Sequence, residues 1–498
     1  MTSDSDKTKV VIIGAGPAGL TAAYELSKAG VNSLLLEKDG VVGGISRTVK
    51  HKGYGFDIGG HRFFTKVKPV EDMWHEVMGE DFLLRKRLSR IYYGKKFFYY
   101  PLRPGNALRN LGLMNAALIL VSYLKAQMFP VKPERNFEEW VSNRFGKRLF
   151  NIFFKTYTEK VWGIPCTEIS AEWPAQRIKG LSLLSALKSA LIKKAQKKGE
   201  VIKTLIDSFH YPKKGPGMMW ERVADIVTDR GSRVMLNAET TKILWSDRIT
   251  GIQVRAEGKT KLVEGTHFIS SMPIRDLIQR LEPAAPDEVL AAASQLNYRD
   301  FLTVALVINR DAFPDNWIYI HDPSVKLGRI QNFKSWSPDM VPDPSTTCLG
   351  LEYFCFEGDG LWNMRDEDLI ELGKRELEIL GLVKPSEVID GSVVRMPKAY
   401  PVYDGDYRGS LKTVREFVEG LGNLQLVGRN GMHKYNNQDH SMLTAMLAAH
   451  NILGANYDLW GVNVDEEYHE ELKGDQKSLS DFGKLASTQP RVPVRAKV

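Results

Sequence analysis

The sequence predicts an α/β fold in which one domain is assembled from separate stretches of the chain. Three observations lead to this prediction. The chain opens with a strand, a glycine-rich turn, a helix and a second strand; a long stretch of helical pattern follows; and strand-like runs then return through the middle of the sequence. At 498 residues the chain is also too long for one core, since single cores seldom exceed about 300 residues.

The first unit has the pattern of a parallel βαβ crossover. Residues 9–13 form a β-branched apolar run, and a helical pattern rich in alanine and leucine extends to about residue 29. A second apolar run covers residues 33–37. A helix between two apolar strands is typical of a parallel sheet, so we expect a Rossmann-type nucleotide-binding domain here.

The later patterns indicate two further domains. Helical patterns at 137–145 and 181–196 predict a helical insertion, and strand-like runs between 234 and 355 predict a mixed sheet. A strand at 424–427 and a helical pattern at 441–453 return the chain to the first domain. The expected boundaries are 1–80, 205–275 and 420–462 for the Rossmann-type domain, 81–204 for the helical domain, 276–419 for the mixed-sheet substrate domain and 463–498 for a polar tail.

The charge balance favours anionic small molecules as partners. The formal net charge is +8 and the pI is about 9.0, but basic residues are spread along the chain rather than gathered in one segment. We therefore expect no nucleic-acid partner.

The cysteines and the N-terminus predict a cytoplasmic protein without a metal site. Cys166, Cys348 and Cys355 have neither C-x-x-C spacing nor a Cys/His metal pattern. The first residues lack an apolar signal core, and the most apolar helical pattern, 111–128, is interrupted by polar residues. We predict that this helix packs against another domain and spans no membrane, with peripheral membrane contact as the alternative.

The glycine-rich turn has the residues that a dinucleotide pyrophosphate requires. Gly14 permits the turn, Gly16 lets the backbone approach the phosphates, and Gly19 lets the helix pack closely on the strand. The N-terminus of the helix, at Pro17 and Ala18, then stabilises the phosphate charge.

A carboxylate and a second glycine turn specify the dinucleotide. Glu37 ends the second strand, where it can accept hydrogen bonds from ribose hydroxyls and would repel the 2′-phosphate of NADP. Residues 43–48 (GGISRT) suit a second approach to a pyrophosphate, as in large FAD-binding oxidoreductases, so we expect non-covalent FAD. The cofactor residues predicted in these segments are Gly14, Gly16, Pro17, Ala18, Gly19, Glu37, Lys38, Gly44, Ile45, Ser46 and Arg47.

Two more segments complete the expected flavin site. Large FAD-binding oxidoreductases bring main chain against the isoalloxazine ring at a segment like the one formed here by Gly59, Gly60 and His61. Gly428 and Arg429, with the start of the last helix, suit the pyrimidine end of the ring, where the helix dipole stabilises negative charge on reduced flavin. The remaining contacts predicted there are Asn437, Gln438 and Ser441.

Three further blocks make the sequence resemble UDP-galactopyranose mutase, within the wider superfamily of FAD-dependent amine oxidases and protoporphyrinogen oxidases. Including the glycine segments, the similarity keeps the same chain order from about residue 8 to residue 460. The three blocks are 157–165 (YTEKVWGIP) with Trp173 and Arg177, 317–319 (WIY) with Arg329, and 435–441 (YNNQDHS).

The resemblance implies a substrate site for a nucleotide sugar. Arg177 and Arg329 would hold the diphosphate, because guanidinium groups bind phosphate oxygens in bidentate geometry; a surface ion pair is the alternative for each. Tyr400 and Tyr435 match tyrosines that contact the diphosphate, or else are core tyrosines. His61 completes the catalytic set, and the substrate-binding set is Tyr100, Trp162, Trp317 and Tyr319, with both tryptophans expected as core residues or walls of the site.

The resemblance also implies a reaction without net redox change. In such mutases reduced FAD attacks the anomeric carbon through N5 while the protein holds the leaving diphosphate, which implies an electron donor such as NAD(P)H and a role in polysaccharide biosynthesis. Tyr100 is followed by Leu102 and Arg103 where the mutases have an aromatic residue and a glutamine that help seat uracil. The alternative is an FAD-dependent oxidoreductase of the amine oxidase, protoporphyrinogen oxidase or desaturase type.

Overall fold

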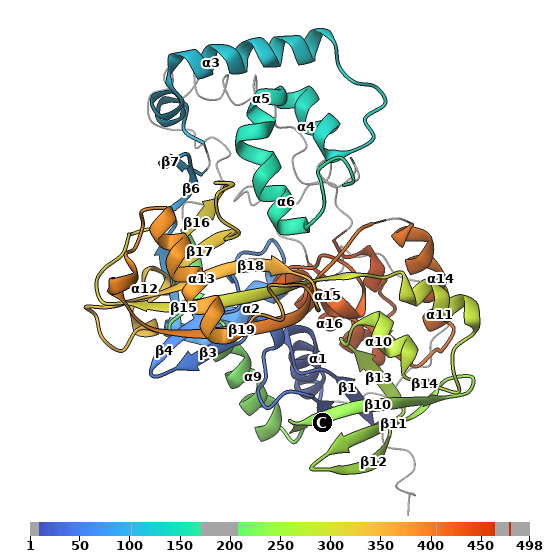
Figure 1. The fold of residues 1–498 in the computed structure, drawn as a ribbon. Coiled ribbons are helices and arrows are strands. Elements are labelled where there is room, and N and C mark those ends of the chain that lie inside the picture. Colours follow the sequence, from blue (N-terminus) through green and yellow to red (C-terminus); the bar gives the residue numbers. More distant parts are fainter. Residues whose placement is uncertain are drawn as a thin grey trace, which may run out of the picture.

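The computed structural model describes residues 9–100, 102–169, 171, 208–404, 406–463 and 478–479, and it shows an α/β protein (Figure 1). Its first main sheet has five strands in the order β20-β13-β1-β2-β9, and every pairing in it is parallel. These strands come from three distant stretches of the chain, so the domain is discontinuous, as the sequence predicts. They are β1 (Val10–Ile13), β2 (Ser33–Leu36), β9 (Arg233–Met235), β13 (His267–Ser270) and β20 (Leu424–Leu426).

Apolar helices cover the five-stranded sheet. Helix α1 (Pro17–Lys28) lies against α16 (Gln438–Ile452) and α9 (Gly217–Asp229), and α2 (Lys68–Met78) packs on α9 and α16. Helix α16 is buried around nearly its whole circumference, which marks it as an interior helix. Because β1 and β20 are parallel, the helices that follow them begin at the same edge of the sheet, which is where open α/β sheets bind ligands.

A small four-stranded sheet and three helices lie beside this domain. Three of its strands, β10 to β12, connect β9 to β13 as an antiparallel meander, and β14 follows β13 and pairs parallel with β10. The sheet lies within the stretch from 234 to 355 for which the sequence predicts strand-like runs. Its elements are β10 (Ala238–Trp245), β11 (Ile249–Ala256), β12 (Lys259–Glu264) and β14 (Leu281–Glu282), with helices α10 (Ile274–Gln279), α11 (Asp287–Ser294) and α14 (Tyr407–Glu419) nearby.

The second main sheet has seven strands in the order β19-β15-β18-β17-β16-β6-β7, and it mixes parallel and antiparallel pairs. Every residue of its central strands β15 and β18 is buried, and helix α13 (Asp366–Ile379) packs on β15 and β19. Residues 89–99, which the sequence pattern assigned to the helical insertion, form β6 and β7 instead. The strands are β6 (Ser89–Tyr93), β7 (Lys96–Tyr99), β15 (Tyr298–Ile308), β16 (Trp317–Ile320), β17 (Arg329–Asn332), β18 (Thr347–Cys355) and β19 (Val388–Pro401).

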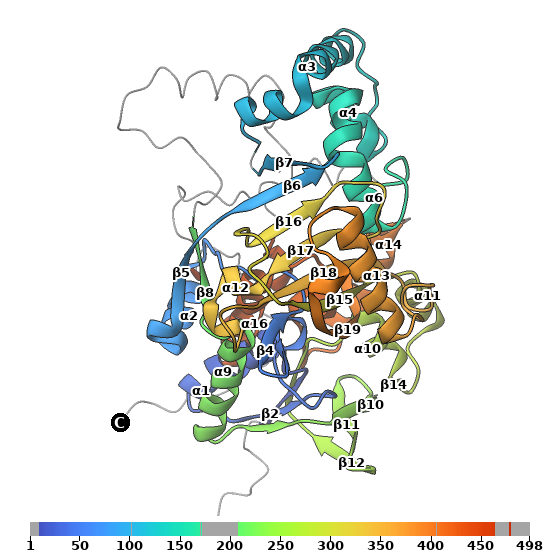
Figure 2. The same cartoon turned by 60° about the vertical axis from the view of Figure 1, so that its left-hand side comes forward.

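A helical insertion projects from the mixed sheet at one end of the molecule (Figures 1 and 2). It contains α3 (Pro104–Met128), α4 (Phe137–Phe145), α5 (Lys147–Phe150) and α6 (Thr156–Trp162); the prediction for 137–145 coincides with α4, and the predicted helix at 181–196 lies outside the described residues. The prediction that the apolar helix packs against another domain was largely wrong. Only 11% of the apolar window of α3 is buried, and Gly105–Met128 taken as a whole passes a length and composition test for a membrane span, although non-helical backbone at Gly112 interrupts it.

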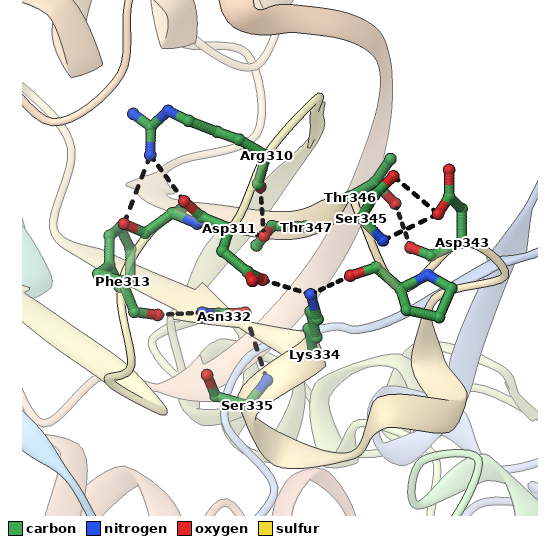
Figure 3. A network of polar contacts seen from close by, with 12 residues as sticks. Arg310, Asp311, Phe313, Asn332, Lys334, Ser335, Asp343, Ser345, Thr346 and Thr347 are labelled. Atoms are coloured by element: carbon green, nitrogen blue, oxygen red, sulfur yellow. Dashed lines mark hydrogen bonds and ion pairs between the residues drawn. The ribbon is translucent and has the colours of Figure 1, made fainter.

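Two antiparallel strand pairs lie outside the larger sheets. Separately, a polar network fixes the end of β17 (Figure 3). Lys334 pairs with Asp311, and Asn332 donates to the Phe313 carbonyl at 2.6 Å. These contacts join the loop after β15 to the end of β17, and so hold the strand that carries Arg329. The paired strands are β3 (Thr48–His51) with β4 (Tyr54–Asp57), and β5 (Phe82–Lys86) with β8 (Ser208–Pro212); α12 (Phe333–Trp336) follows β17.

Candidate functional site

The first glycine turn has the geometry that the sequence predicts. Gly14 has a φ of +96°, and a Cβ at Gly19 would lie 1.9 Å from the Gly14 carbonyl oxygen, so the close packing of α1 on β1 requires glycine. Gly16 is the N-cap of α1 and Pro17 is its first residue. No described side chain caps this helix, so its first N–H groups are available to a phosphate.

A second glycine turn lies directly against the first. Gly44 has a φ of +54°, and a Cβ there would lie 3.3 Å from the Gly16 Cα. The Gly43 N–H donates to the backbone of the first turn at 2.9 Å. The turn continues through the half-buried Ile45 and the buried Ser46. Two stretches of backbone therefore meet with no side chain between them, as a pyrophosphate cradle requires.

Glu37 is buried beside these turns and accepts two backbone hydrogen bonds. The Ala15 N–H donates to its Oε2 at 2.8 Å, and the Asp39 N–H donates to its Oε1 at 3.0 Å. Burial raises the pKa of Glu37, and the two hydrogen bonds oppose that rise. Each carboxylate oxygen keeps a second lone pair that a ribose hydroxyl can use. Lys38 is exposed, and Arg47 pairs with Asp39 at 2.6 Å, which ties the second turn to the end of β2.

A third glycine turn follows β4. Gly59 has a φ of +96°, and a Cβ at Gly60 would lie 2.7 Å from the Gln331 side-chain nitrogen. Gly59 is favoured by its positive φ, and a side chain at Gly60 would have to displace the Gln331 amide. His61 comes next, and its Nδ1 is buried without a hydrogen-bond partner among the described residues.

The turn after β20 closes on the first helix. Gly428 begins the short helix α15 (Gly428–Gly431) with a φ of +81°, and a Cβ there would lie 3.2 Å from the Ala18 Cβ. Arg429 donates from Nε to the Asn436 carbonyl at 2.9 Å and from Nη1 to the Ala399 carbonyl at 3.0 Å. The Arg429 side chain is therefore fixed by backbone on both sides of the turn.

The start of α16 lies in the same place. The Asn437 N–H donates to His440 Nδ1 at 3.3 Å, and Ser441 is buried in the first turn of the helix. Gln438 Nε2 is buried and has no partner in the part of the chain that the structure describes.

These segments fit FAD. Buried polar atoms are normally hydrogen-bonded, so a group of orphaned ones marks a place where a ligand supplies the partners. Four such atoms lie on the third glycine turn, on β17 and around α15 and α16: His61 Nδ1, Gln331 Oε1, Asn430 Oδ1 and Gln438 Nε2. The two facing glycine turns suit the pyrophosphate, and these donors and acceptors suit the polar edge of the flavin.

Strand pairing places Arg329 opposite Glu352. Nε and Nη2 of Arg329 both lie 2.6 Å from Glu352 Oε2, while Oε1 accepts from Gln331 Nε2 at 2.8 Å. Burial lowers the pKa of Arg329, but Glu352 and neighbouring tyrosines outweigh burial and raise it well above its usual value. The sequence reasoning missed Glu352 and Gln331, whose only signal is their position on adjacent strands.

Burial, and then the charges of two arginines, keep His61 neutral. Burial lowers the pKa of His61 to about 3, and Arg429 and Arg329 lower it in the same direction. The imidazole is therefore neutral at pH 7 and is too weak a base for proton abstraction. His61 is suited to hydrogen bonding, through its orphaned Nδ1.

Two predicted tyrosines form a pair beside Arg429. The rings of Tyr400 and Tyr435 stack with centroids 5.6 Å apart at 15°. The Arg429 guanidinium lies 5.2 Å from the Tyr400 centroid and 5.0 Å from that of Tyr435. Burial raises the pKa of Tyr400, and Tyr435 adds to the rise, so the Tyr400 phenol keeps its proton.

A second aromatic group surrounds Tyr319. Its ring meets those of Tyr100 and Tyr157 edge-on, at centroid distances of 5.2 and 5.4 Å, and Arg329 lies 5.9 Å from its centroid. Tyr157 in turn stacks on His321 at 5.0 Å. The structure thus brings Tyr100 and Tyr319 together with Arg329, as the resemblance implies, and adds Tyr157.

Two arginines that sequence reasoning did not select converge on Trp317. The guanidinium carbon of Arg62 lies 5.5 Å from the Trp317 ring centroid, and that of Arg87 lies 5.2 Å away. Arg87 also lies 5.6 Å from the Tyr100 ring. Arg62 directly follows the third glycine turn, which is the one sequence signal that marks it.

The block at 157–165 fixes the insertion to the mixed sheet. Lys160 Nζ donates to three backbone carbonyls of the β16–β17 loop, those of Ile320 at 3.2 Å, Asp322 at 2.7 Å and Leu327 at 2.9 Å. Burial lowers the pKa of Lys160 to about 8. Much of the similarity in this block therefore has a structural cause.

The remaining predicted residues lie elsewhere. Trp162 is buried in the apolar core of the insertion. Arg177 and Trp173 lie outside the described residues. Among the residues that the structure does describe, no group of three His, Cys, Asp or Glu side chains is placed to hold a metal ion. All three cysteines are free and buried.

A family model covers most of the chain. The model of flavin containing amine oxidoreductases matches residues 17–453. The L-amino-acid oxidase of Crotalus adamanteus is 31% identical over 122 residues, which are 21% of this chain and 23% of that relative. The chain therefore matches only about a quarter of the length of that curated relative.

Two solved structures share the fold almost from end to end. Reduced UDP-galactopyranose mutase superposes with a TM-score of 0.76 at 22% identity, over 90% of this chain and 96% of that one. Putrescine oxidase with putrescine bound has a TM-score of 0.57 at 16% identity, over 90% of this chain and 99% of that one. At these identities the likeness establishes the fold alone. With the family match and the glycine cradle, it follows that the chain belongs to the flavin containing amine oxidoreductase family and that its cofactor is FAD.

Proposed function

We propose that this flavoenzyme is a nucleotide-sugar mutase that interconverts pyranose and furanose forms. The observation that supports the proposal most directly is the charge beside the third glycine turn. Arg62, Arg87, Arg329 and Arg429 lie there on or beside aromatic rings, and Arg329 also pairs with Glu352. Guanidinium groups that gather in one place suit a diphosphate, which carries about two negative charges.

In this proposal the protein holds the leaving diphosphate. Arg62 and Arg87 provide donors on the Trp317 side, and Arg329 shares its guanidinium between Glu352 and the phosphate. The Tyr400 hydroxyl stays protonated and donates a further hydrogen bond. Reduced FAD, when bound, supplies the nucleophilic nitrogen that such a reaction needs.

The same proposal has consequences for the surroundings of the enzyme. A flavin that must be reduced requires an electron donor such as NAD(P)H. A product of this kind would enter polysaccharide biosynthesis, and a cytoplasmic location would give access to both nucleotide sugars and reductant.

The stacked tyrosine pair argues against an amine substrate. Parallel aromatic faces attract an ammonium group when they are open to it. Here the rings of Tyr400 and Tyr435 contact each other, and Arg429 already lies within about 5 Å of both ring centres. A second cation beside this pair would be repelled.

The test uses chemically reduced enzyme without oxygen. We expect incubation with UDP-galactofuranose and related nucleotide furanoses to yield pyranose isomers. Arg87→Ala should raise KM about tenfold or more, the cost of one charged hydrogen bond to phosphate, while FAD content is unchanged. Lys86→Ala, at the exposed last residue of β5 directly before Arg87, is the matched control. Turnover by oxidised enzyme alone, with one peroxide per product, would contradict the proposal.

An oxidoreductase is the second candidate. The family match and the L-amino-acid oxidase relative favour it, and putrescine oxidase shares the fold. Oxidised enzyme would then release peroxide when given amino acids or diamines in air. If peroxide forms with none of them while reduced enzyme converts a furanose, this candidate is excluded.

A further inference from the structure

The outer face of α3 gathers exposed apolar side chains. Of the nineteen large hydrophobic residues that are exposed in the described part of the chain, twelve lie between Tyr100 and Val131. Leu113, Met114 and Phe129 are 79%, 75% and 74% exposed. The helix lies along the far end of the insertion, away from the five-stranded sheet (Figures 1 and 2).

The polarity of α3 is the reverse of that of an ordinary surface helix. Two polar residues in its middle face the protein: Asn115 Oδ1 accepts from an Arg148 guanidinium N–H at 2.5 Å, and Ser122 Oγ accepts from the Arg148 backbone N–H at 3.1 Å. Ile119 and Tyr123 are buried on the same side. At about 100° per residue the opposite half of the helix is apolar and exposed. It carries Leu113, Met114, Ala117, Leu118, Leu120, Val121, Leu124 and Met128.

The helix lies along the surface and is too short to cross a bilayer. Gly112 breaks it, with φ 80° and ψ 161°, so the straight part is 113–128. That part is about 24 Å long at 1.5 Å per residue, while a hydrocarbon core is about 30 Å thick. Both flanks are tied back to the protein, since Asn110 donates to the Phe97 carbonyl on β7 at 2.6 Å and the Val131 N–H donates to Asn143 on α4 at 3.0 Å.

The charges around this face have one sign. Residues 82–133 contain ten lysines and arginines and no aspartate or glutamate. Seven of the ten are exposed and make no ion pair with a described carboxylate. They are Lys86, Lys95, Lys96, Arg103, Arg109, Lys125 and Lys132.

We infer that this face docks the protein on an anionic phospholipid surface, with α3 in the plane of the interface. An apolar helical face with basic residues at its margins is the arrangement by which amphipathic helices bind such membranes. A second copy of the chain fits less well, because pairing two of these faces would bring their basic margins together. The docking does not depend on which reaction the flavin supports.

The test is co-sedimentation of the full-length, FAD-loaded protein with vesicles. Vesicles of phosphatidylcholine and phosphatidylglycerol in equal parts should bind the protein, and pure phosphatidylcholine should bind it about tenfold less or weaker, since several basic residues contribute. High salt should reduce binding to the mixed vesicles. Leu120→Asp with Leu124→Asp should lower the partition coefficient at least about tenfold, because two leucines are lost from the buried face.

The control is Leu262→Asp with Ile379→Asp, two equally apolar residues that are 56% and 52% exposed elsewhere on the protein. This variant should bind the mixed vesicles like the parent protein, and both variants should keep the parent Tm and flavin absorbance. Equal binding by parent and Leu120/Leu124 variant would overturn the inference, as would no binding of the parent to either vesicle. A dimer in sedimentation velocity that the Leu120/Leu124 variant abolishes, without vesicle binding, would assign the face to a second copy.

Discussion

Arg329 and Glu352 stand directly opposite each other on β17 and β18, with Arg329 Nε 2.6 Å from Glu352 Oε2. The Glu352 side chain is completely buried, and its other oxygen lies 4.0 Å from where a Gly59 Cβ would be. The pair therefore sits immediately behind the glycine turn of the flavin site. Because Glu352 holds the guanidinium of Arg329 in one orientation, Arg329 is suited to bind a phosphate group in a fixed position. Glu352 also balances part of the positive charge, so Arg329 would attract a phosphate less strongly than an unpaired arginine.

Removing one partner of this buried ion pair should lower the stability of the fold. Arg329→Met leaves Glu352 buried without its cation, and loss of one partner of a buried pair typically costs about 3–5 kcal/mol. We expect a marked fall in Tm with FAD still bound. Adding Glu352→Gln to Arg329→Met should restore a large part of the Tm, because no unpaired charge then remains. Equal Tm values for the single and double variants would show that the pair is not coupled.

Gly19→Ala should abolish FAD binding. A Cβ there would lie 1.9 Å from the Gly14 carbonyl oxygen, so α1 must move away from β1 and take its phosphate-binding end with it. Purified protein should lack flavin absorbance. Gly105→Ala is the matched control, since its Cβ would meet no atom within 4 Å. Normal flavin content in Gly19→Ala would contradict the assigned cradle.

Stability should fall in mild acid because three histidines are buried as neutral groups. Burial lowers the pKa of His61 and His321 to about 3 and that of His433 to about 4, against an ordinary value of 6.5. As the pH falls, these histidines take up protons in the unfolded chain before they do so in the folded protein, so acid favours unfolding. Above pH 6.5 they are neutral in both states and do not affect stability. Between pH 6.5 and about 3 the free energy of unfolding therefore falls progressively.

Each histidine should lower the free energy of unfolding by up to about 1.4 kcal/mol for each pH unit in this range. His321→Asn should therefore flatten the dependence of Tm on pH between about 7 and 5. A slope unchanged in His321→Asn would show that His321 is not buried as a neutral group.

Lys160→Met should loosen the insertion without removing FAD. The ammonium donates to three carbonyls, and hydrogen bonds from charged groups contribute about 1.5–3 kcal/mol each. We expect a lower Tm and faster proteolysis within the insertion, at unchanged flavin content. Lys155→Met, at an exposed position one turn earlier in the chain, should behave like the parent.

The parallel core was predictable because its signals are local. The βαβ unit and the glycine turn depend on residues that are adjacent in sequence, and the predicted runs at 267–270 and 317–320 match β13 and β16. Strand β19 was not predicted, since it carries polar and charged residues along an edge and Lys398 in the left-handed region at φ 55°. The β6–β7 pair was missed because its basic residues hide the alternation of a strand.

The site was predicted only in part, because its charge pairing depends on strand register. The patterns identified Arg329, Tyr319, Tyr400 and Tyr435, which the structure brings around the flavin segments. Glu352 could not be found, since it faces Arg329 only after β17 and β18 pair. Likewise, composition shows that α3 is apolar, but it cannot show that α4 and α5 cover its polar side.

The contacts of Lys160 also connect the helical insertion to the strands of the site. Lys160 holds both ends of the loop between β16 and β17, and the strands on either side of that loop carry Tyr319 and Arg329. Tyr157, three residues before Lys160 on the same helix, packs edge-on against Tyr319. A displacement of the insertion would therefore reach the strands that carry Tyr319 and Arg329 through Lys160 and Tyr157, so that movement at the far end of the molecule is mechanically connected to the flavin site.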